Sequence, residues 1–334
     1  MNWRRDVPLW NIGYSTPVVL ANRSDFGEAS PWMYGLGHDG QINTQYDRGQ
    51  SAAMTQDLSR LRAKGLRIVP TIANVTDGAW SYRPVARMLH SPALMAELVA
   101  AIVALVVSRD YTGIDVHYED LLAADRQAFT LFVTRLATAL QARGKVLSVA
   151  LFAKTTDAGS APRDVAQDYA AIGRVADQVR LMAHDCHRPT SAPGPVAPVS
   201  WVSAVLDYAQ TQIPAAKVVL GVPLYGYDWS DGHGTALSWL QATRLATRYH
   251  ATVHYDAEAQ APWFRYADGS GTPHAVWFEN AESSRAKFAL ARGAGVAGVY
   301  LWMYGGEDIR TWSALRDVRS ASAPSARTTS EASK

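Results

Sequence analysis

The 334 residues of the chain are enough to bury a large core, and a single barrel-type domain with insertions accounts for this length. Hydrophobic residues make up 48% and charged residues 19% of the chain, which is typical of a globular protein. The formal net charge of +2 is too small to favour nucleic acid as a partner.

Short apolar or β-branched runs alternate along the chain with amphipathic helical patterns, which is typical of βα units and a parallel sheet. We predict eight strands, at residues 9–14, 30–36, 66–75, 113–119, 146–154, 178–185, 217–227 and 296–304. Helical patterns such as "AAMTQDLSRLRAKG" and "PALMAELVAAIVALVVSRD" separate them, and several end at a Gly or Pro. The sequence therefore predicts an α/β protein with a (β/α)8 TIM-barrel fold.

Residues 229–280 break this alternation. A helix-like "ALSWLQATRLATRYH" is followed there by three short strand-like runs, which predicts a small α+β insertion between strand seven and helix seven. We expect residues 1–228 to form barrel strands one to seven and residues 281–318 to complete the barrel with strand eight. The tail at 319–334 is a low-complexity run rich in Ser, Ala and Thr and is expected to be disordered.

Cys186 is the only cysteine, so the chain forms no internal disulfide and does not need an oxidising compartment. The N-terminal "MNWRRDVPLWNIGYS" carries positive charge but lacks the apolar core of a signal peptide, and no stretch reaches transmembrane length. We therefore expect a cytoplasmic protein without a membrane partner.

The run "GIDVHYED" at residues 113–120 places an ionisable side chain at every second position. Alternate side chains of a strand share a face, so Asp115, His117 and Glu119 point to one side and the residues between them to the other, toward the helix layer. The polar set then faces the barrel interior at the carboxyl end of strand four, where barrel active sites are built. Burying three ionisable groups costs free energy unless they bond one another, so the run is either a self-satisfied cluster or an active site. Their convergence at one strand end favours the active site.

The stretch "YTGIDVHYED" resembles the strand-four signature D-G-x-D-x-D-x-E of the family-18 glycoside hydrolases. The resemblance runs over nearly the whole chain and is strongest to the branch with bacterial spore-cortex N-acetylglucosaminidases, through "SPWMYGL", "VPTIAN", "LSVALFAKT", "MAHD", "GVPLYGYDW", "VWFENAES" and "GVYLWMYGGED". It implies a chitinase-like barrel in which a glutamate protonates the glycosidic oxygen while the substrate's own 2-acetamido group attacks the anomeric carbon. By this resemblance Glu119 is the general acid/base, and the chemistry is free of cofactors.

Two positions depart from the family pattern. His117 stands where the family has the aspartate that holds the acetamido N–H, and His184 in "MAHD" stands where it has a tyrosine that supports the acetamido carbonyl. Asp115 and Asp185 match the pattern, and the resemblance implies that they belong to the catalytic set with the two histidines. A neutral imidazole can accept the acetamido N–H but lacks the negative charge that balances a developing oxazolinium, so we expect weakened hydrolysis.

Five further residues are predicted to contact substrate. The resemblance makes the strand-eight Trp302 the floor of the sugar site and keeps Met182 on strand six as the pattern has it. Tyr225 and Tyr227 lie near the end of strand seven, where they either line the sugar pocket or pack under the insertion. Asn74 ends "VPTIAN" and either donates to a substrate hydroxyl or caps the following turn.

Three interpretations of the pocket remain open. The first is a modified glycosidase that hydrolyses a β-linked N-acetylamino sugar with Glu119. The second is a non-hydrolytic relative that binds carbohydrate, or that uses Glu119, His117 and His184 for acid/base chemistry on another small molecule, as a biosynthetic enzyme would. A scaffold without activity is the third and has least support, because a dead pocket has no reason to keep these groups. The two histidines with Glu119 or Asp185 also suggest a metal site, but no HExxH-like signature accompanies them, and we predict neither a metal nor another cofactor.

Overall fold

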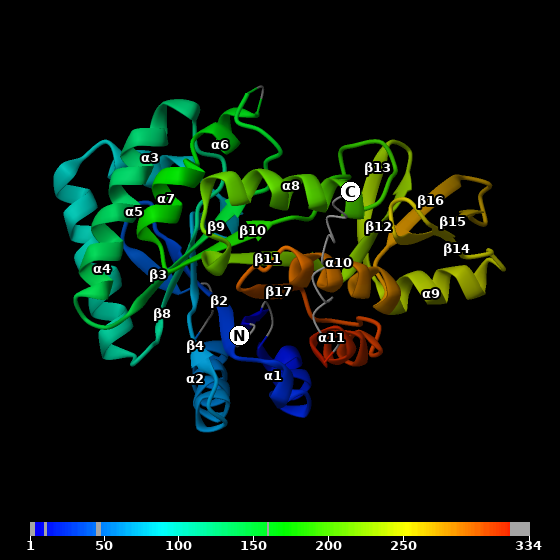
Figure 1. Ribbon diagram of the computed structural model, residues 1–334, viewed down its shortest axis with the longest axis horizontal. Helices are drawn as coiled ribbons and strands as arrows, with labels where there is room; N and C mark the ends of the chain where they lie inside the picture. The colour runs from blue at the N-terminus through cyan, green and yellow to red at the C-terminus, as the bar shows by residue number, and fades with distance from the viewer. Residues whose placement is uncertain (1–3, 10–11, 45–47, 159, 321–334) are drawn as a thin grey trace, which may run out of the picture.

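The computed structural model describes residues 4–9, 12–44, 48–158 and 160–320 (Figure 1). Residues 319 and 320, which were expected to begin a disordered tail, instead end the helix α11 (Thr311–Ser320). The remainder of that tail, from residue 321 onward, lies outside the described residues.

Eight parallel strands form the main sheet: β1 (Arg4–Leu9), β2 (Glu28–Leu36), β5 (Thr71–Ala73), β8 (Gly113–His117), β9 (Val146–Phe152), β10 (Gln178–Met182), β11 (Val218–Pro223) and β17 (Gly298–Trp302). Each strand pairs with the next of these in chain order, and β1 pairs with both β2 and β17. The prediction of a parallel sheet built from βα units is therefore confirmed. Short strands extend it at β3 (Ile42–Thr44) and β4 (Arg67–Ile68), while β6 (Val75–Thr76) and β7 (Ala79–Trp80) form a separate hairpin.

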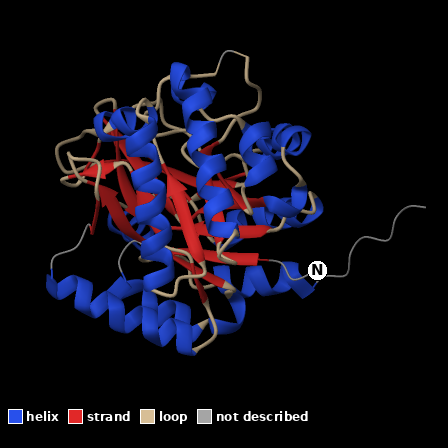
Figure 2. Ribbon diagram, turned by 90° about the vertical axis from the view of Figure 1, so that its left-hand side faces the viewer, coloured by secondary structure: helices blue, strands red, loops and turns tan. Residues whose placement is uncertain are grey.

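Helices cover the outer side of these strands, as Figure 2 shows. They are α1 (Ile12–Ala21), α2 (Arg48–Ala63), α3 (Tyr82–Leu89), α4 (Pro92–Ser108), α5 (Arg126–Gln141), α6 (Pro162–Val165), α7 (Tyr169–Val175), α8 (Val199–Gln212), α10 (Ala281–Gly293) and α11. Short 3-10 turns occupy Arg23–Asp25, Ala123–Asp125 and Ala215–Lys217. Within the described part of the chain no single helix is long and apolar enough to cross a membrane; α3 and α4, bent by 110°, meet that test only as a pair and only by length and composition.

Helix α4 illustrates why these segments are helical. Ser91 caps it by accepting a hydrogen bond from Leu94 N, and Pro92 takes the first helical position, where the missing N–H has no cost. Its buried residues recur at helical spacing, for example Met95, Leu98 and Ile102, and face the sheet.

The first predicted strand was placed too late in the chain. Residues 9–14 were expected to be a strand, but β1 ends at Leu9 and α1 begins at Ile12. The backbone of residues 4–9 is the segment that pairs with β2 and β17. Apolar composition alone does not distinguish a short strand from the start of an apolar helix, and tertiary pairing decided between them.

A second, antiparallel sheet lies beside the main one, on the right in Figure 1. Its order is β13 (His233–Ser238), β12 (Tyr225–Ser230), β16 (Pro273–Phe278), β15 (Ala261–Ala267) and β14 (His254–Asp256), and α9 (Trp239–Arg248) packs on one face. The sheet begins at Tyr225, before the predicted boundary at residue 229. The predicted strand 217–227 is accordingly divided at Leu224, whose N–H donates to Trp302 O at 2.7 Å, and its two parts join different sheets.

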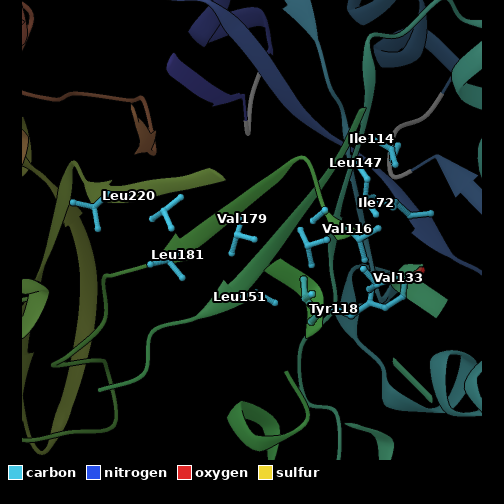
Figure 3. Close-up of a cluster of buried hydrophobic side chains, with 14 of the residues drawn as sticks. Ile72, Ile114, Val116, Tyr118, Val133, Leu147, Leu151, Val179, Leu181 and Leu220 are labelled. Atoms are coloured by element: carbon cyan, nitrogen blue, oxygen red, sulfur yellow. The ribbon is translucent and has the colours of Figure 1, made fainter. Parts of the chain in front are cut away.

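The main core lies between the parallel strands and the helices. Figure 3 shows part of it, including Ile114 and Val116 of β8 among residues of the neighbouring strands. Tyr118 continues this outward face and stacks on Phe132 of α5, with ring centroids 5.8 Å apart and planes at 15°. The alternate residues of β8 therefore point to the opposite side of the sheet, away from the helices, as the period of two predicts.

Candidate active site

A cavity of about 270 Å³ lies at the carboxyl ends of the parallel strands. Of the residues predicted to form a site, it brings together Asp115, His117, Glu119, Met182, His184, Asp185 and Trp302. The other lining residues, which were not among the predicted site residues, are Trp32, Thr71, Trp80, Ala150, Arg180 and Tyr300. The cavity is thus built from strands that are distant in the sequence, and its wall is mainly aromatic and ionisable.

A signal for part of the missed set was present in the sequence. Arg180 alternates with Met182 on β10, so the period of two that located His117 also places this arginine on the cavity side. Tyr300 alternates with Trp302 on β17 in the same way. Trp80 has no such signal, because it reaches the cavity from the β6–β7 hairpin.

Glu119 and His117 form a hydrogen-bonded pair in the wall of this cavity. His117 ends β8 and Glu119 follows two residues later, and the distance between His117 Nε2 and Glu119 Oε1 is 2.8 Å. Their side chains are only 11% and 19% exposed. The imidazole also packs against Trp32 and Trp80, with ring centroids 4.9 and 5.5 Å away. The glutamate is therefore held toward the cavity, with the His117 imidazole bonded to one of its oxygens.

Asn74 fixes the main chain of Glu119. Its Oδ1 accepts from Glu119 N at 2.8 Å, and its Nδ2 donates to Glu119 O at 2.8 Å and to Ser81 O at 3.2 Å. The backbone pairing of β5 with β8 ends at Ala73 and His117, so the Asn74 amide extends that pairing to the glutamate. Asn74 is fully buried and does not line the cavity. This placement contradicts the predicted contact with substrate and makes Asn74 a positioning residue.

Asp115 belongs to a buried polar network beneath the cavity. Its Oδ1 accepts from Ser148 Oγ at 2.5 Å, and its Oδ2 lies 3.3 Å from a guanidinium nitrogen of Arg180. Arg180 also pairs with Glu28, at 2.8 Å, and donates to Ser30 Oγ. All three charged groups are almost fully buried. One arginine thus compensates two carboxylates, and Asp115 supports the floor of the cavity.

Asp185 is held as an anion at the other side of the cavity. Tyr225 and Tyr227 donate their hydroxyls to its Oδ1 at 2.6 and 2.7 Å, and His184 Nδ1 lies 3.3 Å from Oδ2. Burial acts to raise the pKa of Asp185, but the hydrogen bonds and the charge of His184 outweigh it, and the pKa is lowered from its usual value. Burial, with the charge of Asp185, raises the pKa of both tyrosines, so they remain neutral donors.

Trp302 joins this cavity to a second hollow of about 300 Å³. His184 lies parallel to its indole, at 6.4 Å between centroids and 6° between planes, and Trp32 is 5.8 Å away. The second hollow shares Trp302 and Asp185 with the cavity and is also lined by Tyr225 and Tyr227. Aromatic faces of this kind pack well on the apolar faces of sugar rings.

Metal binding finds no support in this geometry. Among the described residues, no group of three or more His, Cys, Asp and Glu side chains is arranged to hold a metal ion. His117 bonds to Glu119 and His184 approaches Asp185, so each histidine has a carboxylate partner of its own. The described residues therefore do not form a metal site with two histidines and one carboxylate.

Comparison with known proteins gives one consistent result. The family described as "Glycosyl hydrolases family 18" matches residues 24–307. A cortical fragment-lytic enzyme of Bacillus subtilis is 32% identical over 300 residues, which cover 87% of this chain and 69% of the relative. A second cortical fragment-lytic enzyme, from Bacillus anthracis, is 31% identical, and the match covers 73% of this chain but only 58% of the relative.

Solved structures of the same kind share the fold. The chitinase of Chromobacterium violaceum superposes with a TM-score of 0.89 at 28% identity, and the match covers 96% of this chain and all of that one. The spore cortex-lytic enzyme SleL of Bacillus cereus superposes with a TM-score of 0.84 at 25% identity, covering 94% of this chain and 74% of that one. The fold of this chain therefore also occurs in solved structures of a chitinase and of a spore cortex-lytic enzyme.

Proposed function

The chain belongs to glycosyl hydrolase family 18, and from this membership we propose that it hydrolyses a β-linked N-acetylamino sugar with Glu119 as general acid/base. The observation that carries the proposal is the Glu119 carboxylate, which lines the cavity with one oxygen 2.8 Å from His117 Nε2. Trp302 offers a flat apolar face and Asp185 an anion in the same cavity. The relatives named cortical fragment-lytic enzymes favour a bacterial cell-wall glycan as the substrate.

In the proposed reaction, the bond between the anomeric carbon and the glycosidic oxygen breaks as Glu119 donates its proton to that oxygen. The carbonyl oxygen of the substrate's 2-acetamido group forms a bond to the anomeric carbon, and a positively charged oxazolinium results. Water then adds to the anomeric carbon, and Glu119 takes a proton from this water. The bond between the anomeric carbon and the acetamido carbonyl oxygen breaks in the same step. Asp185, held as an anion by its two tyrosines, stabilises the positive charge.

Restoring the family residue at position 117 is expected to raise turnover. His117→Asp supplies the negative charge that a neutral imidazole lacks beside the acetamido N–H. Because losing one such preorganised partner costs about 10²–10³ in rate, we expect kcat to rise at least about tenfold. The measurement is kcat on 4-nitrophenyl N-acetyl-β-glucosaminide, with His254→Asp, on the exposed strand β14, as the control for added charge. A fall in kcat would mean that His117 has a chemistry of its own.

Asn74→Leu is expected to lower kcat by about 10- to 100-fold while KM changes little. The change removes the amide that holds both the N–H and the carbonyl of Glu119, and each buried group left unpaired costs about 1–3 kcal/mol. Asn22→Leu removes a comparable side-chain bond, to Val18 O, away from the cavity and serves as the matched control. Equal losses of kcat in the two variants, or a loss confined to KM, would contradict a positioning role.

We also propose that the ring of parallel strands is a closed (β/α)8 barrel, and that the second sheet with α9 is its insertion between strand seven (β11) and helix seven (α10). The pairing of β1 with both β2 and β17 supports the closed barrel. The insertion is supported by the position of residues 225–278, which lie in the chain between β11 and α10.

The two histidines support a second candidate function. A barrel that keeps Glu119 but has His117 and His184 in place of the family's aspartate and tyrosine could bind carbohydrate without cleaving it, or transfer protons on another small molecule. Binding of N-acetylglucosamine oligomers without release of product, in the wild type and in Glu119→Gln alike, would favour this function over hydrolysis.

A further inference from the structure

Three hollows follow one another away from Glu119. The cavity shares Asp185 and Trp302 with the second hollow. The second hollow shares Ala236, Leu237 and Gln241 with a third, of about 340 Å³, between the edge strand β13 and α9. A chain of sugars bound in the cavity can therefore extend past Trp302 and around the edge of the second sheet.

The third hollow carries two guanidinium groups. Arg244 and Arg248 lie one helical turn apart on α9, both are exposed, and both line the hollow. The acidic residue in the same lining, Asp228, is mostly buried, accepts from the Tyr266 hydroxyl at 2.6 Å and pairs with His274 Nδ1 at 2.8 Å. The sequence of α9, "WLQATRLATR", contains no acid. The hollow therefore presents positive charge to whatever occupies it.

We propose that the third hollow binds a carboxylate that the glycan carries at a distance from the cleaved sugar, beyond Trp302, so that the enzyme prefers an acidic glycan of N-acetylamino sugars to a neutral one. The proposal rests on the proposed function, because that function places the substrate chain in the first two hollows. A guanidinium matches a carboxylate with two parallel hydrogen bonds, and a pair of guanidiniums on one helix face can engage either one carboxylate or two. A neutral chain would offer no carboxylate to either arginine.

The carboxylate could come from an acid attached directly to the sugar or from a peptide joined to it, and the ligands of the experiment separate these sources. Binding is measured by calorimetry in Glu119→Gln, which leaves the third hollow intact and prevents cleavage. The ligands are a tetramer of β-1,4-linked N-acetylglucosamine, an otherwise equal tetramer in which alternate sugars carry a lactyl ether carboxylate, and the methyl ester of that tetramer. The fourth ligand is the same tetramer with each lactyl carboxyl joined by an amide bond to a dipeptide that ends in a free carboxylate.

The variant is Arg244→Gln with Arg248→Gln, and the control is Arg60→Gln with Lys64→Gln, at the end of α2, which removes the same charge elsewhere. Exposed ion pairs are each worth a few tenths of a kcal/mol to about 1 kcal/mol, so the double variant is expected to raise the Kd of the acidic ligands about 3- to 10-fold. The Kd of the neutral tetramer and of the methyl ester should not change. The effect should shrink as salt rises.

If the double arginine variant loses affinity for the lactyl ligand only, the sugar acid is the source of the carboxylate. If it loses affinity for the peptide ligand only, the peptide is the source. The proposal is wrong if the double arginine variant loses equal affinity for neutral and acidic ligands, or loses affinity for none of them. It is also wrong if the α2 control loses as much affinity for the acidic ligands as the arginine variant does. Turnover by the wild type is measured in parallel on the neutral tetramer. If the wild type turns a ligand over but the double arginine variant has an unchanged Kd for the acidic ligands, only this inference is wrong. If that Kd rises but no ligand is turned over, only the proposed function is wrong.

Discussion

Glu119→Gln is expected to lower kcat by a factor of about 10²–10⁴, the range that general acid/base catalysis supplies. The amide has nearly the same shape as the carboxyl group and can still bond to His117, but it has no acidic proton for the glycosidic oxygen. The affinity for sugar should remain, since the walls of the cavity are unchanged. The measurement is kcat on 4-nitrophenyl N-acetyl-β-glucosaminide together with the Kd of an N-acetylglucosamine oligomer.

Glu258→Gln is the matched control, because this exposed glutamate lies on the second sheet's β14–β15 connection and does not line the cavity. It should have wild-type kcat. A loss of less than tenfold in Glu119→Gln, with measurable turnover in the wild type, would show that another group donates the proton, and the proposed role of Glu119 would be wrong.

Arg180→Met is expected to cost about 3–5 kcal/mol in the free energy of unfolding. Arg180 pairs with both Glu28 and Asp115, and its removal leaves the buried Asp115 without its cation and Glu28 with only the partly exposed Arg67. Methionine is apolar and comparable in length, so the loss reports the missing charge more than a missing volume. Urea unfolding followed by circular dichroism gives the free energy, and an unchanged slope would confirm that only stability has changed.

Arg67→Met is the matched control for this prediction. Arg67 pairs with the same carboxylate, Glu28, at 3.1 Å, but its side chain is 37% exposed, so water replaces the lost contact. We expect a cost of about 1 kcal/mol or less. Similar costs in the two variants would mean that the interior carboxylates do not depend on Arg180, and that the network beneath the cavity has another source of stability.

These two predictions concern different layers of one site. The upper layer, with Glu119 and Asp185, faces the cavity and carries the proposed chemistry. The lower layer, with Asp115 and Arg180, also borders the cavity, but its side chains are almost fully buried and their charges pair with each other. A substitution confined to the upper layer, for example at His117 or His184, is therefore expected to change the proposed chemistry without removing the charge pairs of the lower layer.

A local period predicted which side chains of β8 share a face. Asp115 and His117 alternate along β8, and the extended backbone turns both toward the cavity side of the sheet wherever that strand is placed. Glu119 is a harder case because β8 ends at His117. It reaches the cavity because the Asn74 amide continues the strand pairing beyond that end, and nothing in "TIAN" indicates this partner.

The errors lie where a local pattern fits two outcomes. Residues 9–14 are apolar in a way that suits a short strand or the first turn of a helix, and the pairing of residues 4–9 with two neighbouring strands decided the matter. The run 217–227 was predicted as one strand because it is apolar throughout. Its break at Leu224 depends on Trp302, which lies far along the chain.

The sequence by itself determined the βα alternation, the face of each strand, and the residues that converge at the strand ends, because these follow from side-chain periods of two and 3.6. Tertiary structure alone decided that Arg180 meets Glu28, that Trp80 packs on His117, and that the arginines of α9 line the third hollow. Such contacts join segments far apart in the chain. Their geometry is set by how whole elements pack, which no local pattern encodes.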